Sequence, residues 1–123
     1  MIKNILLVGL GGAAGSILRF LCQKWITSIT SLSFPLGTFL VNITGCFLIG
    51  LFFSYGTKHE YFSYNMQLLL MTGLCGGFTT FSAFTLESMG LIKEDKTGLF
   101  LLYIGGSVIL GLLATWVGIK IAR

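Results

Sequence analysis

Charged residues are scarce in this chain. Only 10% of its 123 residues are Asp, Glu, Lys or Arg, whereas 54% are hydrophobic, and the mean hydropathy is +0.91. The chain also has a single proline and a single histidine. Soluble domains carry about 25% charged residues. The composition therefore excludes an ordinary soluble fold and indicates an integral membrane protein.

The chain has few residues suited to metal binding or catalysis. The three cysteines, Cys22, Cys46 and Cys75, lie inside apolar segments without CxxC spacing, so we expect them to pack rather than to bind zinc or form disulfides. No phosphate-binding glycine loop and no Ser/His/Asp constellation is present, and we predict that the protein is not an enzyme. The net charge of +4 and the pI of about 9.2 suit a membrane surface rather than a nucleic-acid groove. Nothing in the sequence implies a soluble protein partner.

Four apolar intervals separate the charged clusters. They cover about residues 4–29, 35–55, 64–92 and 98–119. Each is long enough to cross a hydrocarbon core, which takes about 20 helical residues. Because the connectors are short, we predict one all-α transmembrane domain over residues 1–123, with no soluble domain between the spans.

The third interval carries glycines and hydroxyl side chains at its centre, in the segment GLCGGFTTFSAF from Gly73 to Phe84. Unwound backbone at bilayer depth is tolerated only where it is buried in protein or lines a polar cavity. In transporters, such a break marks an ion or substrate site. We therefore predict a glycine-rich break near residues 76–80.

The positive charges are nearly balanced across the predicted membrane. Four spans place on one side Lys3, Lys58, Lys120 and Arg123, and on the other Lys24, Lys93 and Lys96, with Arg19 if it reaches that interface. The positive-inside rule needs a charge bias to set orientation. We therefore expect insertion in both orientations.

Small residues recur at helical spacing. Gly11 and Gly15 form a GxxxG pair, Gly45 lies on the second span, and a small-residue ridge on the fourth span comprises Ser107, Gly111 and Thr115. Four short helices enclose little interior, so we expect assembly through such contacts. Ordinary packing within one chain remains the alternative, because this spacing is frequent in membrane helices.

The deeper polar side chains carry no charge. Thr38 and Asn42 are four residues apart, as are Tyr103 and Ser107, so each pair shares a helical face. Hydrogen-bond donors without fixed charge suit a dehydrating anion. The midspan amide of Asn42 is costly unless it bonds a permeating ion or a neighbouring helix, and both readings stay open.

Two phenylalanines and two ionisable residues complete the candidates. Phe81 and Phe84 follow the predicted break on nearly one face, where their positive ring edges could cradle an anion or simply pack in a core. Arg19 and Glu87 lie toward the ends of their helices, where we expect a vestibule or interface position. The lack of a midspan carboxylate argues against a proton-coupled carrier.

Three segments in this order resemble the Fluc (CrcB-type) fluoride channels: GGAAGSILRF at residues 11–20, PLGTFLVNITGCFLIG at 35–50 and GLCGGFTTFSAF at 73–84. The resemblance implies a passive channel that exports fluoride from the cytoplasm and so relieves its toxicity. It also implies a dual-topology homodimer of antiparallel subunits with two fluoride pathways, in a bacterial inner membrane.

The resemblance also implies roles for particular residues. Asn42 would coordinate fluoride, and Phe81 and Phe84 would line the pores. The backbone carbonyls of Gly76 and Thr79 would hold a structural sodium ion at the dimer centre, and carbonyl oxygens suit such a hard cation.

Further pore residues implied by the resemblance are Tyr103, Ser107, Thr38 and Ser82. Arg19 matches the arginine of the first motif, and the role of Glu87 at a pore mouth stays unassigned. The chain departs from the pattern at Gly111, where relatives can carry a serine that extends the polar track of the fourth helix.

Two rival functions remain at this stage. A small dual-topology multidrug or cation exporter would need an embedded carboxylate in the first helix, and this first span contains only Arg19. A noncatalytic assembly subunit would explain the small-residue ridges but leave Asn42 and the break without a purpose.

Overall fold

The structure is a computed structural model that describes residues 1–123. It is entirely helical, with the elements α1 (Ile2–Ile29), α2 (Leu36–Lys58), α3 (Tyr64–Gln67), the π-helical η1 (Leu68–Cys75), α4 (Gly76–Phe78), α5 (Ser82–Lys93) and α6 (Thr97–Ala122). Four helical stretches are long and apolar enough to cross a membrane, the third formed by residues 64–93. The expectation of an all-helical protein with four spans is confirmed.

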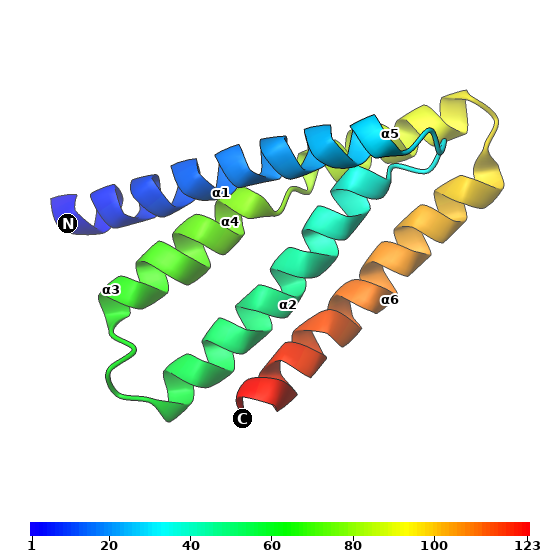
Figure 1. Ribbon diagram of the computed structural model, residues 1–123. Coiled ribbons are helices and arrows are strands. Elements are labelled where there is room, and N and C mark those ends of the chain that lie inside the picture. Colours follow the sequence, from blue (N-terminus) through cyan, green and yellow to red (C-terminus); the bar gives the residue numbers. More distant parts are fainter.

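The spans associate as two parallel pairs (Figure 1). One pair is α1 with the first half of the third span, and the other is α2 with α6. The second half of the third span, α5, leaves the first pair and packs on α6. The third span thus bridges the two pairs, and its midpoint lies where they meet.

Glycines allow α1 and the third span to approach closely. A methyl group on Gly77 would lie 2.5 Å from the carbonyl oxygen of Gly12, and one on Gly73 would lie 2.9 Å from the Cα atom of Gly11. Gly15 meets the same helix one turn further on. The GxxxG pair is therefore used within the chain, where small residues let helix backbones come together.

The pair formed by α2 and α6 is built in the same way. A methyl group on Gly118 would lie 2.9 Å from the backbone nitrogen of Leu51. The Thr115 hydroxyl donates to the Cys46 carbonyl over 3.0 Å. Two members of the small-residue ridge, Gly111 and Thr115, thus pack with Gly118 against α2 of the same chain.

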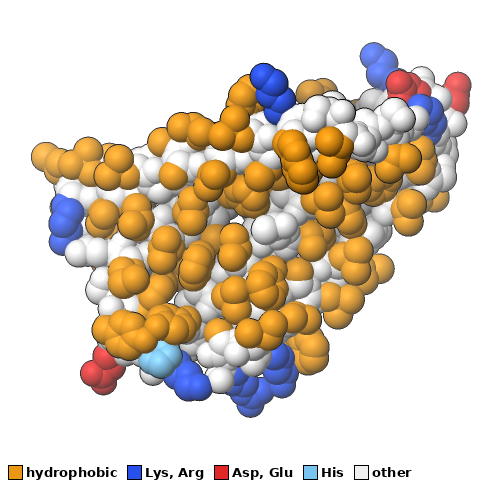
Figure 2. All heavy atoms as spheres, in the orientation of Figure 1, with side chains coloured by type: hydrophobic (Ala, Val, Ile, Leu, Met, Phe, Trp, Pro, Cys, Tyr) orange, Lys and Arg blue, Asp and Glu red, His pale blue; other side chains and the backbone are white.

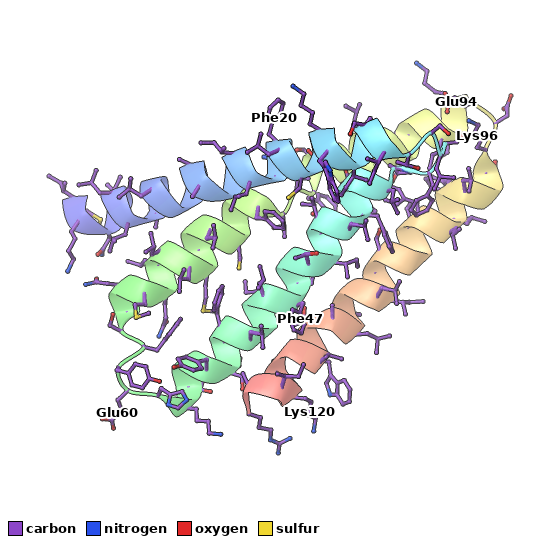
Figure 3. All side chains as sticks on the ribbon, in the orientation of Figure 1. Phe20, Phe47, Glu60, Glu94, Lys96 and Lys120 are labelled. Atoms are coloured by element: carbon purple, nitrogen blue, oxygen red, sulfur yellow. The ribbon has the colours of Figure 1, made fainter.

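Apolar side chains cover the face of the molecule seen in Figure 2, and most charged side chains lie toward its two ends. Figure 3 places Glu60 and Lys120 at one end and Glu94 and Lys96 at the other. Both chain termini (Figure 1) lie at the end where Figure 3 labels Glu60. This distribution is that of a multi-pass membrane protein with lipid around its flanks.

The connector between α2 and α3 is rich in aromatic rings. The Tyr55 and Tyr61 hydroxyls are hydrogen-bonded, and this bond raises the pKa of Tyr61 above its ordinary value. The connector ends at Ser63, whose hydroxyl accepts from the Met66 N–H over 3.3 Å and caps α3. Aromatic residues at this level suit the interface between lipid and water.

Candidate functional site

The third span is interrupted after its glycines rather than at them. Gly76 keeps helical dihedrals, with φ −62° and ψ −38°, whereas Thr79 is extended, with φ −86° and ψ 158°. The backbone returns to a helix at Ser82. The predicted break near residues 76–80 therefore needs correcting: the interruption covers residues 79–81, after the glycines, and Gly77 serves close packing with α1 instead.

The side chain of Asn42 holds this interruption in place. Its Nδ2 donates to the Thr80 carbonyl over 2.9 Å, and its Oδ1 accepts from the Thr80 N–H over 2.8 Å. The Asn42 amide thus satisfies both backbone polar groups of one residue, Thr80, which the interrupted helix leaves without partners. One Nδ2 hydrogen remains, because an amide nitrogen has two.

Hydroxyl groups on either side of the interruption close the two helix ends. The Thr79 hydroxyl and N–H both donate to the Cys75 carbonyl, over 2.9 Å and 3.1 Å. The Thr80 hydroxyl accepts from the Ala83 N–H over 3.2 Å and lies 3.3 Å from the Ser82 hydroxyl oxygen. Thr80 therefore caps the start of α5.

The carbonyls near the interruption differ in their partners. The Gly77 carbonyl accepts from Arg19 Nε over 3.1 Å. The Gly76 carbonyl loses its usual helical donor, because the Thr80 N–H is bound to Asn42. No N–H or O–H of the chain donates to the carbonyl of Gly76 or of Thr79. Both carbonyl oxygens are thus free to accept from another partner.

A groove of about 360 Å³ lies beside the interruption. It lies between the helix pairs, and residues of α2, the third span and α6, which are far apart in the sequence, line it. Six of the predicted site residues line it, namely Asn42, Gly76, Thr79, Phe81, Phe84 and Ser107. Its lining includes no charged side chain.

The two phenylalanines occupy different surroundings. Phe81 is 76% exposed, while Phe84 is half-buried and packs on Tyr103 with ring centroids 5.0 Å apart. The two phenylalanine rings are themselves 5.9 Å apart and tilted by 42°. Phe84 is therefore fixed by the protomer, whereas Phe81 projects from it.

Beyond Tyr103 the polar groups converge on Glu87. The Tyr103 hydroxyl donates to Glu87 Oε1 over 3.1 Å, and the Thr38 hydroxyl donates to Oε2 over 3.0 Å. Tyr103 is fully buried and Thr38 is 2% exposed. Two hydroxyl donors thus satisfy the Glu87 carboxylate in the low-dielectric interior.

A second cavity, also about 360 Å³, opens beside this carboxylate. Thr38, Glu87 and Gln23 line it, together with the polar connector between α1 and α2. It lies at the bundle end opposite the two chain termini. Glu87 thus lines a cavity at this end of the bundle, whereas Arg19 lies apart from it on the Gly77 carbonyl.

The fourth helix contributes one unsatisfied group. The Ser107 hydroxyl oxygen is buried and has no hydrogen-bond partner. One turn further, a methyl group on Gly111 would meet the Cys46 sulfur at 3.4 Å, and the next hydroxyl, on Thr115, is committed to the Cys46 carbonyl. The polar track of α6 therefore ends at Ser107 in this chain.

Sequence reasoning missed Gln23. Its Nε2 donates to the Thr38 hydroxyl oxygen over 2.9 Å, which extends the chain of hydrogen bonds from Glu87 to α1. The signal was present, because Gln23 stands four residues after Arg19 and shares its helical face. Gln23 is also an uncharged polar residue within the first predicted span.

Comparison with known proteins gives a consistent family. The family model described as "CrcB-like protein, Camphor Resistance (CrcB)" matches residues 6–119. A protein of Flavobacterium psychrophilum is 47% identical over 121 residues, which cover 98% of each chain. A protein of Phocaeicola vulgatus is 47% identical over 95% of this chain and 96% of its own. One of Oceanobacillus iheyensis is 42% identical over 98% and 92%. All three carry the name "Fluoride-specific ion channel FluC".

Proposed function

Because this chain belongs to the CrcB-like family and matches its fluoride-specific relatives over nearly their whole length, we infer that it is a fluoride-selective ion channel. It is a transport protein rather than an enzyme, and it works as a multi-pass protein of a bacterial membrane. The single observation that carries the function is the uncharged groove at the interrupted third span, lined by an amide, three hydroxyls and two aromatic rings.

We propose that the channel exports fluoride passively. Fluoride enters acidified cells as neutral HF, dissociates inside and is trapped as the anion. A negative-inside potential then drives the anion outward with about 2.3 kcal/mol per 100 mV. A pore that offers donors without fixed charge suits this task, because it replaces water around the ion without holding it too tightly to leave.

The proposed pore lining follows the groove and the polar track behind it. Asn42 keeps one amide hydrogen after binding Thr80, and this hydrogen is free for an anion. Phe81 and Phe84 would present ring edges, and the unpartnered Ser107 hydroxyl would donate deeper in the same groove. Ser82, Thr38 and Tyr103 would continue the path with further hydroxyl groups, of which those of Thr38 and Tyr103 donate to Glu87.

We propose that the working form is an antiparallel homodimer with two such pores. The groove is open in one protomer, and Phe81 at its rim is largely exposed. Open carbonyls facing lipid would cost several kcal/mol each, so a covering partner is needed. A second copy in the opposite orientation suits the balanced charges at the two ends of the chain.

A structural sodium ion at the dimer centre accords with the same carbonyls. The oxygens of Gly76 and Thr79 lack donors within the chain, and two copies would supply four. Oxygen ligands without a carboxylate suit a monovalent hard cation. Sodium bound there would stabilise the dimer without being transported.

The small multidrug or cation exporter finds less support. Its chemistry would need an embedded carboxylate on the first helix, and α1 carries only Arg19 at depth, bound to the Gly77 carbonyl. The carboxylate of Glu87 lies near the bundle end and is bonded by two hydroxyls.

The test is fluoride efflux from liposomes that contain the purified protein, with valinomycin to clamp the voltage and chloride efflux measured in parallel. Fast fluoride release without chloride release is the expected result. Failure of dimeric, reconstituted protein to release fluoride would overturn the function. Phe84→Leu should slow release while the protein still elutes as a dimer.

A further inference from the structure

Three cations lie at the end of the bundle where α2 and α6 finish. Lys58 closes α2, Lys120 lies in the last turn of α6, and Arg123 follows that helix. All three residues are exposed. Figure 2 shows a group of blue side chains along this end of the molecule, and Figure 3 labels Lys120 there. This end therefore presents a basic patch, which comprises Lys58, Lys120 and Arg123.

No carboxylate pairs with the basic patch. The only ion pair in the chain joins Lys96 to Glu94, with 3.5 Å between Nζ and Oε2, at the opposite end of the bundle. At that end, the run from Lys93 to Lys96 contains two acidic and two basic residues, so its charges cancel. The charges of the basic patch are not cancelled in this way, and they attract an anion.

Exposed apolar side chains adjoin the basic patch on α6. The Lys120 Nζ lies 5.5 Å from the centre of the Trp116 ring, one helical turn earlier. Trp116 is 56% exposed and Ile121 is 65% exposed. Tryptophan is typical of the interface between lipid and water, where its apolar ring meets the acyl chains. Trp116 therefore places the neighbouring Lys120 ammonium at the level of the lipid headgroups.

The patch and its apolar neighbours together favour an amphipathic anion. Arg123 can bind a phosphate through two parallel hydrogen bonds, and the lysines add point charges. A free phosphate ion would satisfy these cations but would make no contact with Trp116 and Ile121. A phospholipid satisfies both, because its phosphate lies next to its acyl chains. A negatively charged lipid is favoured over a zwitterionic one, since the patch contains no carboxylate for a choline or ethanolamine cation.

We propose that the basic patch binds the headgroup of an anionic phospholipid, and that Trp116 packs against the acyl chain of that lipid. The site lies outside the proposed ion path, because none of these residues lines either cavity described above. In the proposed antiparallel dimer, one such site faces each leaflet.

Tryptophan fluorescence can test this site. The chain has two tryptophans, Trp116 beside the patch and Trp25 on α1, toward the opposite end. Trp25→Phe leaves Trp116 as the only indole, and Trp116→Phe leaves Trp25, which follows Lys24, as a matched control. Each full-length protein is reconstituted in vesicles that contain dibrominated phosphatidylglycerol or dibrominated phosphatidylcholine at the same mole fraction. Bromine quenches a tryptophan that it contacts.

We expect the relative binding constant at Trp116 to be about fivefold higher for brominated phosphatidylglycerol than for brominated phosphatidylcholine. This ratio corresponds to the attraction that one cation contributes near an anionic surface. Lys120→Gln with Arg123→Gln should reduce the ratio to one, whereas Lys24→Gln should leave it unchanged. Brominated phosphatidylcholine should still quench Trp116 in both variants, which shows that they remain inserted. Trp25 should be quenched equally by the two lipids.

Inorganic phosphate, added at constant ionic strength, separates a lipid headgroup from a free ion and should leave the ratio at Trp116 unchanged. Equal quenching of Trp116 by the two lipids would overturn the proposal. So would a preference that survives the double substitution, one that is equally strong at Trp25, or one that inorganic phosphate abolishes. None of these measurements requires fluoride transport, so the channel function is tested separately.

Discussion

The side-chain amide of Asn42 replaces the helical hydrogen-bond partners of Thr80. Its Oδ1 accepts from the Thr80 N–H over 2.8 Å, and its Nδ2 donates to the Thr80 carbonyl over 2.9 Å. This pairing joins α2 to the middle of the third span. It also means that one side chain serves two roles, because the same amide is a proposed fluoride ligand. Transport loss alone would therefore not separate the pore role from the structural one.

The first prediction concerns the stability supplied by Asn42. Asn42→Leu leaves the N–H and the carbonyl of Thr80 without partners, at about 1–3 kcal/mol for each buried group. We expect a lower free energy of unfolding, measured by titrating the detergent-solubilised protein with SDS. Asn65→Leu, at an exposed site on α3, is the control and should match the wild type. An equally stable Asn42→Leu protein would show that the pairing with Thr80 is not needed.

The second prediction concerns the contact between α1 and α4. A methyl group on Gly77 would lie 2.5 Å from the Gly12 carbonyl oxygen, so Gly77→Ala must push the two helices apart. Overpacking of this kind costs about 1–3 kcal/mol. We expect a lower melting temperature in detergent. Gly90→Ala is the control, since a methyl group there meets nothing within 4 Å; it should be as stable as the wild type or slightly more so. Equal melting of both variants would contradict the close contact.

The third prediction concerns the end of α5. Asp95 has φ 58°, the only positive φ outside glycine in the chain, and the Lys96 N–H bonds back to the Leu91 carbonyl over 2.8 Å. This closure favours glycine at residue 95.

Comparison of two neutral substitutions isolates the backbone effect. The Asp95→Gly protein should have a free energy of unfolding about 1 kcal/mol higher than that of the Asp95→Ala protein, because alanine is strained in the left-handed region. At position 94, where φ is −89°, the order should reverse, because Gly has more freedom to lose on folding. Thermal melting of the four variants tests this reversal. The same order at both positions would rule out the left-handed closure.

Much of the fold followed from the sequence, because hydropathy and length alone define membrane spans. The site was predictable in part. Asn42 and Phe84 were identified from their depth and spacing, and the structure gathers both at one groove. Spacing reveals which residues share a helical face, and that was sufficient here.

Contacts between residues of different helices could not be predicted from the spacing within one helix. Gly76 and Gly77 suggested an unwound backbone, yet both are helical, and the missing side chain of Gly77 serves contact with α1. The glycine ridges suggested subunit contacts but pack within the chain. Gln23 was overlooked because its hydrogen-bond partner, Thr38, lies on a different helix. Each case depends on the relative rotation of two helices, which one helix's sequence does not encode.

The fourth prediction concerns sodium. If a sodium ion binds the open carbonyls of Gly76 and Thr79 in the dimer, replacing NaCl by N-methyl-D-glucamine chloride should weaken the assembly. The bulky organic cation cannot enter a carbonyl cage. We expect a lower melting temperature and a larger monomer fraction by light scattering, both restored when sodium is added. Identical melting and dimer fraction in the two salts, at equal ionic strength, would exclude a stabilising sodium site.

The last prediction concerns orientation. One end of the bundle carries Lys3, Lys58, Lys120 and Arg123, and the other carries Lys24, Lys93 and Lys96. Because four positive charges oppose three, two added lysines should outweigh the difference at either end. His59→Lys with Glu60→Lys loads the first end, and Ser31→Lys with Glu94→Lys loads the second.

Each loaded variant should insert mostly in one orientation, as read from cysteine labelling of a tag at the C-terminus in intact cells. Expressed alone, neither should protect cells from fluoride, because an antiparallel dimer needs both orientations. Expressed together, they should restore protection. Two copies of the same loaded variant provide the matched control. Full protection by one variant held in a single orientation would refute the antiparallel dimer while leaving the fluoride channel itself intact.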